Sequence, residues 1–347
     1  MKAWLLRFIA IVTLALTGIT SASFAQTHSD KLRVYFIDVE GGQSTLFVTP
    51  EHESLLIDTG WPGENGRDAD RIVAAAQKAG LSKIDYVLIT HYHADHAGGI
   101  PALVSRIPVG TFLDHGPNTE FDKGITEQDY AEYKKVLATG KYKVLEPKPG
   151  DILPIKGFKA TVISSDGNLI ANPLAGAGQQ NSYCQGVQAP PADQTENSHS
   201  LGIEIDFGKL KLLDLGDLTR DKEFPLVCPA NKLGHIDIYI VSHHGWDQSS
   251  SAVFVDAIHP RAAIMDNGAK KGGSTSVLKT VEAAPGLETL WQIHYSEEGA
   301  ANNTQEQYIA NLHGPDSAYG LELSAGKDGS FDVTNIRTGA AKHYAAK

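Results

Sequence analysis

Apolar positions along the chain recur with two periods. A period of two residues predicts strands, and a period near 3.6 residues predicts helices. Three short apolar or alternating runs predict a meander of strands over Leu32–Ile37, Ser44–Val48 and Ser54–Ile57. Helical spacing over Ala69–Ala79, closed by Gly80, predicts a helix. The apolar run that starts at Ile84 then predicts a strand that ends just before His91.

The same alternation continues to the end of the printed sequence. We expect a helix over Glu127–Ala138, and a polar segment at 165–198 predicts a long loop. The expected strands are Tyr142–Leu145, Ala160–Ile163, Leu201–Phe207, Leu210–Leu215, Ile236–Val241, Ala262–Met265 and Thr289–Ile293, with helices Ser251–Ile258 and Ser276–Glu282 and a hairpin of Gly320–Ser324 with Ser330–Ile336. Two such halves without a linker predict one α/β fold, a four-layer αββα sandwich of two sheets with helices outside.

Residues 1–25 have the composition of a secretory signal. Lys2 and Arg7 precede the apolar stretch Phe8–Leu16, and small residues flank Phe24 up to Ala25. We therefore expect cleavage after Ala25, a periplasmic or secreted protein, and a single domain over residues 26–347. No other run approaches the roughly 20 apolar residues of a membrane-spanning helix.

The net charge limits the kinds of partner that we expect, and the cysteine content predicts a disulfide. The chain carries a net charge of -11, and losing Lys2 and Arg7 with the signal gives -11 - 2 = -13. A negative surface repels polyanions, which disfavours nucleic acid and favours a small-molecule or small phosphorylated substrate. The two cysteines, Cys184 and Cys228, can close a disulfide in an oxidising compartment, with two buried thiols as the alternative.

The cluster His91-Tyr92-His93-Ala94-Asp95-His96 carries the strongest chemical signal. Imidazole and carboxylate are ligands that zinc prefers, and this spacing on a loop can direct side chains to two adjacent ions. Histidine clusters also occur in tags and solvated loops, but those are polar on both sides. Here a strand-like run precedes the cluster and Gly98-Gly99 follows it, so the context favours a metal site.

The order of motifs resembles the metallo-β-lactamase superfamily. The motifs are Leu55-Leu56-Ile57-Asp58-Thr59-Gly60, the His91–His96 cluster, His199, Gly216-Asp217 and His243-His244-Gly245. The resemblance implies the αββα fold, a metal-dependent hydrolase and a set of ligands. It assigns His91, His93 and His199 to a first metal, Asp95, His96 and a final histidine to a second, and Asp217 to the bridge between them.

Spacing leaves the roles of three further residues open. Either His243 or His244 follows the expected strand over Ile236–Val241; the resemblance favours His243 as the ligand and leaves His244 to orient substrate or ligands. Asp58 is expected to accept the second N–H of a ligand imidazole, with an ordinary turn aspartate as the alternative.

The resemblance implies two Zn²⁺ ions that generate a bridging hydroxide near neutral pH, with Asp95 and Asp217 as proton relays in catalysis. The donor types also suit iron or manganese. An iron-dependent oxidoreductase and a metal-binding module are therefore further alternatives.

Within the superfamily the chain resembles the catalytic domain of DNA-uptake competence proteins. Its segment Phe36–Ser44 is similar to that branch's Asp-Val-Gly-Gln-Gly-Asp-Ser motif but has Glu40, Gly41 and Gln43, and Gly273-Ser274-Thr275 stands where that branch has His-Pro. The resemblance makes phosphodiesters the leading substrate class, although these departures argue against a nuclease. Lys270-Lys271 can meet a phosphate or carboxylate on a smaller substrate, and a solvated loop explains the pair as well. The alternative is a lactam, lactone or amide, with Trp61 and Trp246 as an apolar wall.

Overall fold

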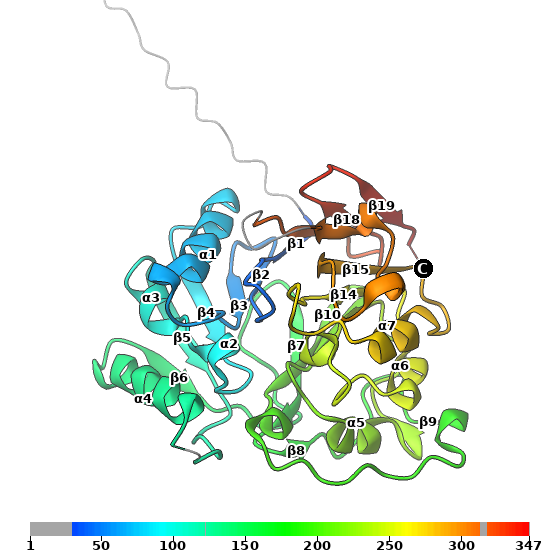
Figure 1. Ribbon diagram of the computed structural model, residues 1–347. Coiled ribbons are helices and arrows are strands. Elements are labelled where there is room, and N and C mark those ends of the chain that lie inside the picture. Colours follow the sequence, from blue (N-terminus) through cyan, green and yellow to red (C-terminus); the bar gives the residue numbers. More distant parts are fainter. Residues whose placement is uncertain (1–29, 122, 313–317, 347) are drawn as a thin grey trace, which may run out of the picture.

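The computed structural model describes residues 30–121, 123–312 and 318–346, which form two large mixed sheets with helices on their outer faces (Figure 1). The expected signal over residues 1–25 lies outside the described residues. Within the described part, no helix is long and apolar enough to cross a bilayer.

The first sheet has nine strands. Their order is β19 (Ala341–Tyr344), β18 (Phe331–Asn335), β17 (Leu321–Ala325), β1 (Leu32–Phe36), β2 (Thr45–Val48), β3 (Ser54–Ile57), β4 (Ile84–Leu88), β5 (Val109–Leu113) and β6 (Lys143–Leu145). The pairs from β19 to β3 are antiparallel, whereas β3 to β6 are parallel.

The second sheet has eight strands and the same division. Their order is β16 (Ile309–Asn311), β15 (Thr289–His294), β14 (Ala262–Met265), β13 (Ile238–Ile240), β11 (Leu210–Asp214), β10 (Gly202–Phe207), β7 (Lys159–Ser165) and β8 (Asn168–Leu169). The pairs from β16 to β11 are parallel and the rest antiparallel. β12 (Ala230–Asn231) and β9 (Gln179–Gln180) form a separate antiparallel pair.

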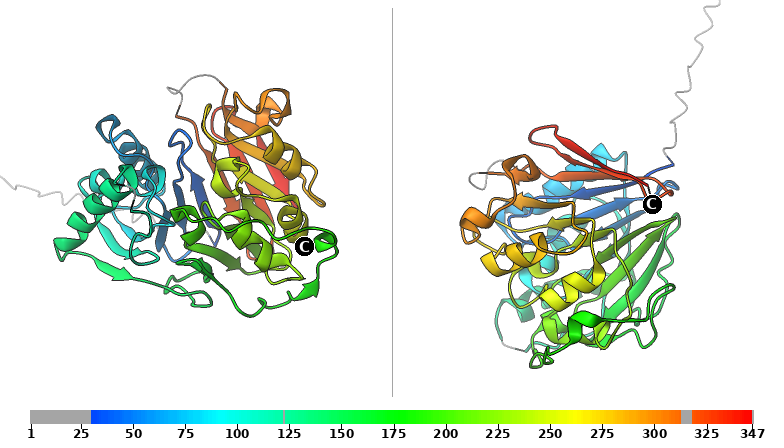
Figure 2. Two further views of the ribbon diagram at one scale, coloured as in Figure 1. Left: turned by 60° about the horizontal axis from the view of Figure 1, so that its bottom comes forward. Right: turned by 90° about the vertical axis from the view of Figure 1, so that its right-hand side faces the viewer.

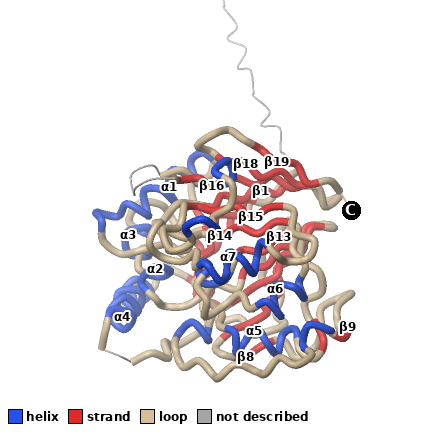
Figure 3. The backbone as a smooth tube through the Cα atoms, turned by 45° about the vertical axis from the view of Figure 1, so that its right-hand side comes forward, coloured by secondary structure: helices blue, strands red, loops and turns tan. Residues whose placement is uncertain are grey.

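Helices cover the outer face of each sheet, as Figures 2 and 3 show. The α-helices are α1 (Arg67–Lys78), α2 (Ala94–Ala97), α3 (Ile100–Val104), α4 (Ile125–Ala138), α5 (Arg220–Val227), α6 (Ala252–Ile258) and α7 (Thr275–Glu282). The 3-10 helices are η1 (Glu64–Gly66), η2 (Ser182–Cys184), η3 (Glu196–His199), η4 (Ser242–Gly245), η5 (Ala300–Asn302) and η6 (Glu306–Tyr308).

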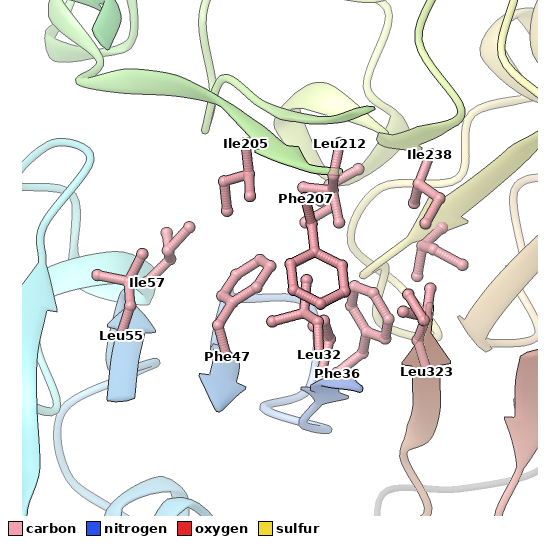
Figure 4. Packing of buried hydrophobic residues seen from close by; sticks show 14 of the residues in the cluster. Leu32, Phe36, Phe47, Leu55, Ile57, Ile205, Phe207, Leu212, Ile238 and Leu323 are labelled. Atoms are coloured by element: carbon pink, nitrogen blue, oxygen red, sulfur yellow. The ribbon is translucent and has the colours of Figure 1, made fainter. Parts of the chain in front are cut away.

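Three apolar layers hold these elements together. Phe36 and Phe47 of the first sheet meet Phe207 of the second in the central layer (Figure 4). Because side chains alternate along a strand, Tyr35 and Ile37 point away from that layer, toward the helices α1, α3 and α4. The corresponding layer beyond the second sheet packs against α5, α6 and α7. The four-layer αββα sandwich predicted from the sequence is confirmed.

This arrangement brings the candidate site residues to the same edge of the two sheets. The parallel strands β3, β4, β11, β13 and β14 are followed by the loops that carry Asp58, the His91–His96 cluster, Asp217, His243-His244 and Asp266. Residues just after parallel strands gather at the carboxyl edge of a sheet, and open α/β sheets bind their ligands there.

Candidate metal centre

The His91–His96 cluster folds as a tight turn followed by the single-turn helix α2. His93 stands immediately before this helix, so Asp95 and His96 come from its turn while His91 and His93 come from the preceding loop. His91 and His96 are fully buried and their ring centroids lie 4.1 Å apart. His91 Nε2 lies 3.0 Å from His93 Nδ1. The turn therefore presents ring nitrogens of several histidines to one small volume.

Asp217 brings the second sheet to these histidines. Its Oδ2 lies 3.8 Å from His91 Nε2, 3.3 Å from His96 Nε2 and 3.4 Å from His243 Nε2. Its Oδ1 lies 3.5 Å from His244 Nε2. A carboxylate with imidazoles around both oxygens has the position expected of a bridging ligand.

Four side chains converge most closely, and we call Asp95, His96, Asp217 and His244 the inner group. One ligand atom from each lies within 4.8 Å of the others, and all four residues are buried. Asp95 Oδ2 is 3.2 Å from His96 Nε2 and 3.0 Å from His244 Nε2, and the two ring nitrogens are 3.1 Å apart. Two carboxylates and two imidazoles in this geometry suit a divalent cation of the zinc type.

If these histidines bind a metal, the ring nitrogen of each that faces away from this volume should have its own hydrogen-bond partner. A ligating histidine usually donates its other N–H to an oxygen, which leaves a lone pair for the ion. Five of the six candidate histidines have such a partner. The outward nitrogen pairs with Thr90 Oγ1 in His91 (3.1 Å), Glu120 Oε2 in His93 (3.2 Å), Asp58 Oδ2 in His96 (2.7 Å), Asp166 Oδ1 in His199 (3.3 Å) and Ser249 Oγ in His243 (3.5 Å). His244 Nδ1 lies 3.4 Å from Asp266 Oδ1 without forming a hydrogen bond.

Buried oxygens point to the same fit. Asp217 Oδ1 and both oxygens of Asp266 are buried without a hydrogen-bond partner among the described residues. An unsatisfied carboxylate in the interior is costly, and a cation near it offsets that cost. The residues present therefore fit a bound metal, with the inner group and the pair His91 and His93 as the side chains that would hold it.

Electrostatics of the site favour neutral imidazole at one end and positive charge at the other. Burial, with His96 and His93 beside it, lowers the pKa of His91 well below its usual value, so this ring is neutral and able to ligate. Burial and Lys271 act to lower the pKa of His244, but Asp217 and Asp266 outweigh them and raise it to about 10. The carboxylates thus attract positive charge to the inner group.

Asp58 lies where a supporting acceptor is expected. Its buried carboxylate accepts His96 Nδ1–H at 2.7 Å, and Thr90 donates to it through N–H at 2.8 Å and Oγ1–H at 2.7 Å. Thr90 Oγ1 in turn faces His91 Nδ1, so one aspartate orients two histidines. These contacts are the kind that we expect of a carboxylate that supports a ligand imidazole.

The structure places the rings of His243 and His244 differently. His244, not His243, joins Asp95 and His96, whereas His243 packs on Trp246 with ring centroids 5.5 Å apart. Both residues have left-handed backbone, with φ of 57° and 53°, which turns the second ring inward. Such backbone is strained outside glycine and concentrates at functional sites.

His199 lies farther out than the resemblance implied. It ends η3, its side chain is 25% exposed, and it pairs with Asp166. Its ring lies 6.2 Å from that of His115. Neither close group of metal-type ligands found among the described residues includes His199.

Sequence reasoning missed three carboxylates near the site. Asp266 directly follows β14, so the strand-end rule that identified Asp217 would also have found it. Glu120 accepts from the backbone N–H of Glu196 at 3.0 Å as well as facing His93. Glu120 lies in an irregular loop, where no pattern marks it, whereas Asp166 and Gly167 form the two-residue turn between β7 and β8.

The long segment at 165–198 borders the site and is anchored by a disulfide. Cys184 and Cys228 are bonded, which ties η2 to the end of α5. Within the same segment, buried Glu196 accepts from His115 Nε2 at 3.0 Å and from Thr119 N–H at 2.5 Å. Burial would raise the pKa of Glu196, but these donors outweigh it and lower the pKa to about 2.

The sequence is similar to those of known proteins. Residues 38–169 match the family described as Metallo-beta-lactamase superfamily, a stretch that includes Asp58 and the His91–His96 cluster. The chain is 25% identical over 259 residues to ComE operon protein 3 of Bacillus subtilis, covering 69% of this chain and 29% of that protein. It is 25% identical over 257 residues to Competence protein ComA of Neisseria gonorrhoeae, covering 74% and 30%.

A shorter relative is the UPF0173 metal-dependent hydrolase of Cupriavidus metallidurans, 25% identical over 237 residues that cover 65% of this chain and 69% of that protein. The chain spans less than a third of the length of the two competence-type relatives. The expected resemblance to both the superfamily and its competence branch is confirmed. Residues 38–169 thus match a metallo-beta-lactamase domain, and the chain is similar over a longer stretch to a protein named as a metal-dependent hydrolase.

Proposed function

We propose that the protein is a secreted, binuclear zinc hydrolase that acts on phosphodiesters. One observation carries the proposal: Asp217 stands between two adjacent sets of inward-facing donors. His91 Nε2 and His93 Nδ1 form one set, and Asp95, His96 and His244 form the other. The resemblance assigns His199 to the first set as well, although its ring pairs with Asp166 in the structure.

These residues would hold two zinc ions, which when bound polarise the group under attack and lower the pKa of water toward about 7. The chain's own part is to keep the ligands aligned and in the right protonation state. Burial keeps His91 neutral, and Asp58 and Glu120 fix the rings of His96 and His93 by accepting their outward N–H groups. Asp95 and Asp217 are the carboxylates placed to accept and pass on a proton.

A phosphodiester is favoured over a lactam, lactone or amide because a cation lies inside the site. Lys271 Nζ contacts Asp95 Oδ2, and both Trp61 and Trp246 are turned toward that ammonium rather than forming a purely apolar wall. A phosphodiester keeps a negative charge on its non-bridging oxygens, whereas an uncharged lactone offers none to a lysine. The acidic net charge favours small diesters over polymeric nucleic acid.

Secretion rests on residues 1–25 and accords with the Cys184–Cys228 disulfide, because disulfides persist in oxidising compartments. The mass of the mature protein tests it directly. Expression of the full chain in a bacterium with a periplasm should give a periplasmic protein that begins after Ala25. An unprocessed cytosolic protein would contradict the proposal.

A hydrolysis screen with metal analysis tests the activity. Protein purified without added salts is assayed for zinc, iron and manganese, then zinc-loaded and offered a bis-aryl phosphodiester, a chromogenic cephalosporin and an acyl lactone. We expect two zinc ions per chain and turnover of the phosphodiester alone, with a short DNA oligonucleotide cleaved more slowly. Turnover of only the lactam or lactone would establish the alternative substrate class, and two iron ions would favour the oxidoreductase.

A further inference from the structure

Lys271 lies inside the metal centre, although sequence alone left it as a candidate for a solvated loop. It belongs to the loop between β14 and α7, and its side chain is 21% exposed. Its ammonium contacts Asp95 Oδ2 and donates a hydrogen bond to the Gly41 carbonyl oxygen at 2.9 Å. The neighbouring Lys270 is exposed. The two lysines, adjacent in sequence, therefore occupy opposite environments.

Two indoles flank the Lys271 ammonium. Nζ lies 5.2 Å from the ring centroid of Trp61 and 5.7 Å from that of Trp246. A lysine cation within about 6 Å of an indole face is attracted by the ring's electrons. Trp61 comes from the loop after β3 and Trp246 from the loop after β13, so three separate strand ends converge on this one ammonium.

The loop that carries Lys271 is fixed against the metal centre. Gly273 N–H donates to the His244 carbonyl oxygen at 2.9 Å, and Gly268 N–H donates to the Lys271 carbonyl oxygen at 2.8 Å. A Cβ on Gly272 would lie 2.2 Å from the His244 oxygen, and one on Gly41 would lie 2.7 Å from the Gly268 nitrogen. Such close backbone contacts hold the lysine in place before any substrate arrives, which reduces the ordering cost of binding.

A lysine in this place opposes a metal ion, so its presence calls for an explanation. An ammonium that contacts Asp95 repels a cation held by the same carboxylate. An anion bound at the mouth of the site would offset that repulsion by interacting with the ammonium and the metal together. An ammonium has three N–H donors, and the structure gives Lys271 two acceptors among the described residues, Gly41 and Asp95.

We propose that Lys271 binds a non-bridging, anionic oxygen of the phosphodiester through its remaining N–H, with the indoles of Trp61 and Trp246 as walls on either side. Lys271 is then a substrate-binding residue that selects anionic over neutral esters. This inference rests on the proposed function for the identity of the substrate. The position of the ammonium itself does not depend on it.

The test compares Lys271→Met with the matched control Lys270→Met, which removes the same charge from the adjacent exposed position. Inorganic phosphate is titrated into the zinc-loaded proteins and followed by calorimetry and by tryptophan fluorescence, since Trp61 and Trp246 border the site. Loss of a charge-assisted hydrogen bond predicts a dissociation constant for phosphate about tenfold or more higher in Lys271→Met. Lys270→Met should bind phosphate like the wild type, and Lys271→Arg should retain much of the binding.

Kinetics and metal content complete the test. In Lys271→Met, KM for a bis-aryl phosphodiester should rise about tenfold, KM for a neutral aryl acetate should stay unchanged, and zinc per chain should equal that of the wild type. Phosphate binding that is absent in the wild type or unchanged in Lys271→Met would overturn the inference. So would a gain of zinc in Lys271→Met without loss of phosphate binding, because the lysine would then merely take the place of an ion.

The outcomes separate this inference from the proposed function. A wild type that binds phosphate through Lys271 but cleaves no phosphodiester would refute the function and keep the anion site. A wild type that cleaves the diester with a KM that Lys271→Met does not change would keep the function and refute the role of Lys271.

Discussion

The inner group and the two outer histidines, His93 and His199, are built from the same kinds of side chain but are held differently. Within the inner group, His96 and His244 face carboxylates at strand ends, Asp58 after β3 and Asp266 after β14. The outer histidines face Glu120 and Asp166, which lie in loops. They are 23% and 25% exposed, while His96 and His244 are buried.

This difference indicates that the inner group is the more rigid part of the candidate metal centre. The inner group takes its geometry from the ends of both sheets and so from the whole core. The outer histidines face carboxylates in the 115–121 loop and in the turn between β7 and β8, and their own side chains are partly exposed to solvent. Substitutions should therefore cost more activity and more metal at the inner group than at the outer histidines.

The largest effect is expected at Asp217, which contacts both sets of donors. Asp217→Ala should lower kcat/KM by about 1,000-fold or more and reduce zinc below one ion per chain, because each set loses a ligand. Asp247→Ala, an exposed carboxylate in the loop next to Trp246, is the matched control and should keep full activity. Folding of both variants is checked by thermal unfolding. Full zinc content in Asp217→Ala would refute its bridging position.

The second-largest loss of activity is expected for His244, and the same substitution at His243 should have a smaller effect. His244→Ala should lose one of two zinc ions and about 100-fold in kcat/KM, since only His244 joins Asp95 and His96. His243→Ala should keep both ions, because that ring contacts Asp217 and Trp246 at the side of the group. Metal content per chain decides between them, and the reverse pattern would restore our expectation from the sequence.

Substituting the carboxylates that orient the histidines should weaken zinc binding less than losing a ligand does. These variants compare the inner group directly with the outer histidines. Asp58→Asn should weaken zinc binding by about 10- to 100-fold, because Asp58 orients His96 and, through Thr90, His91. Glu120→Gln should weaken zinc binding by about tenfold at most, because the side chain is 24% exposed and faces only one of the histidines, His93. Chelator competition measures both. Equal losses would show that the outer histidines are held as rigidly as the inner group.

Glu223 should affect stability without affecting turnover. Its buried carboxylate accepts N–H groups of Ser250 and Ser251, and burial raises its pKa to about 7. Between about pH 4.5 and 7 the folded chain then binds more protons than the unfolded chain, so this contribution to the free energy of unfolding falls as pH rises through that window and stays constant above it.

Glu223→Gln removes this titration. The wild type minus variant difference in unfolding free energy should therefore fall by at most about 3 kcal/mol from pH 5 to pH 8. Denaturant unfolding at both values measures it. A difference that is the same at pH 5 and pH 8 would show that Glu223 does not titrate in this range.

Most of the fold could be predicted because both faces of the central strands are buried and read as apolar runs. The hairpin of β17 and β18 and the strands β10 and β11 are found as expected. β5 was missed because Gly110 and Thr111 interrupt its apolar pattern, and α5 because it is short and contains Pro225. The 165–198 segment, expected as a loop, includes the two-residue strands β8 and β9, too short to leave a pattern.

The centre was predictable where its residues follow strands and not where they depend on loops. The cluster at 91–96 and Asp217 are marked by the apolar runs before them. The choice of His244 over His243 depends on a left-handed turn that the pair His-His-Gly does not specify. Likewise, the partial burial of Lys271 beside exposed Lys270 accompanies the close approach of the Gly41 and Gly268 backbones, which are far apart in sequence.

Anomalous diffraction at the zinc edge from crystals of the zinc-loaded protein tests the central claim most directly. We expect two peaks about 3.5 to 4 Å apart, one on each side of Asp217, with Asp95, His96 and His244 around one and His91 and His93 at the other. A single peak, or peaks remote from Asp217, would contradict the account.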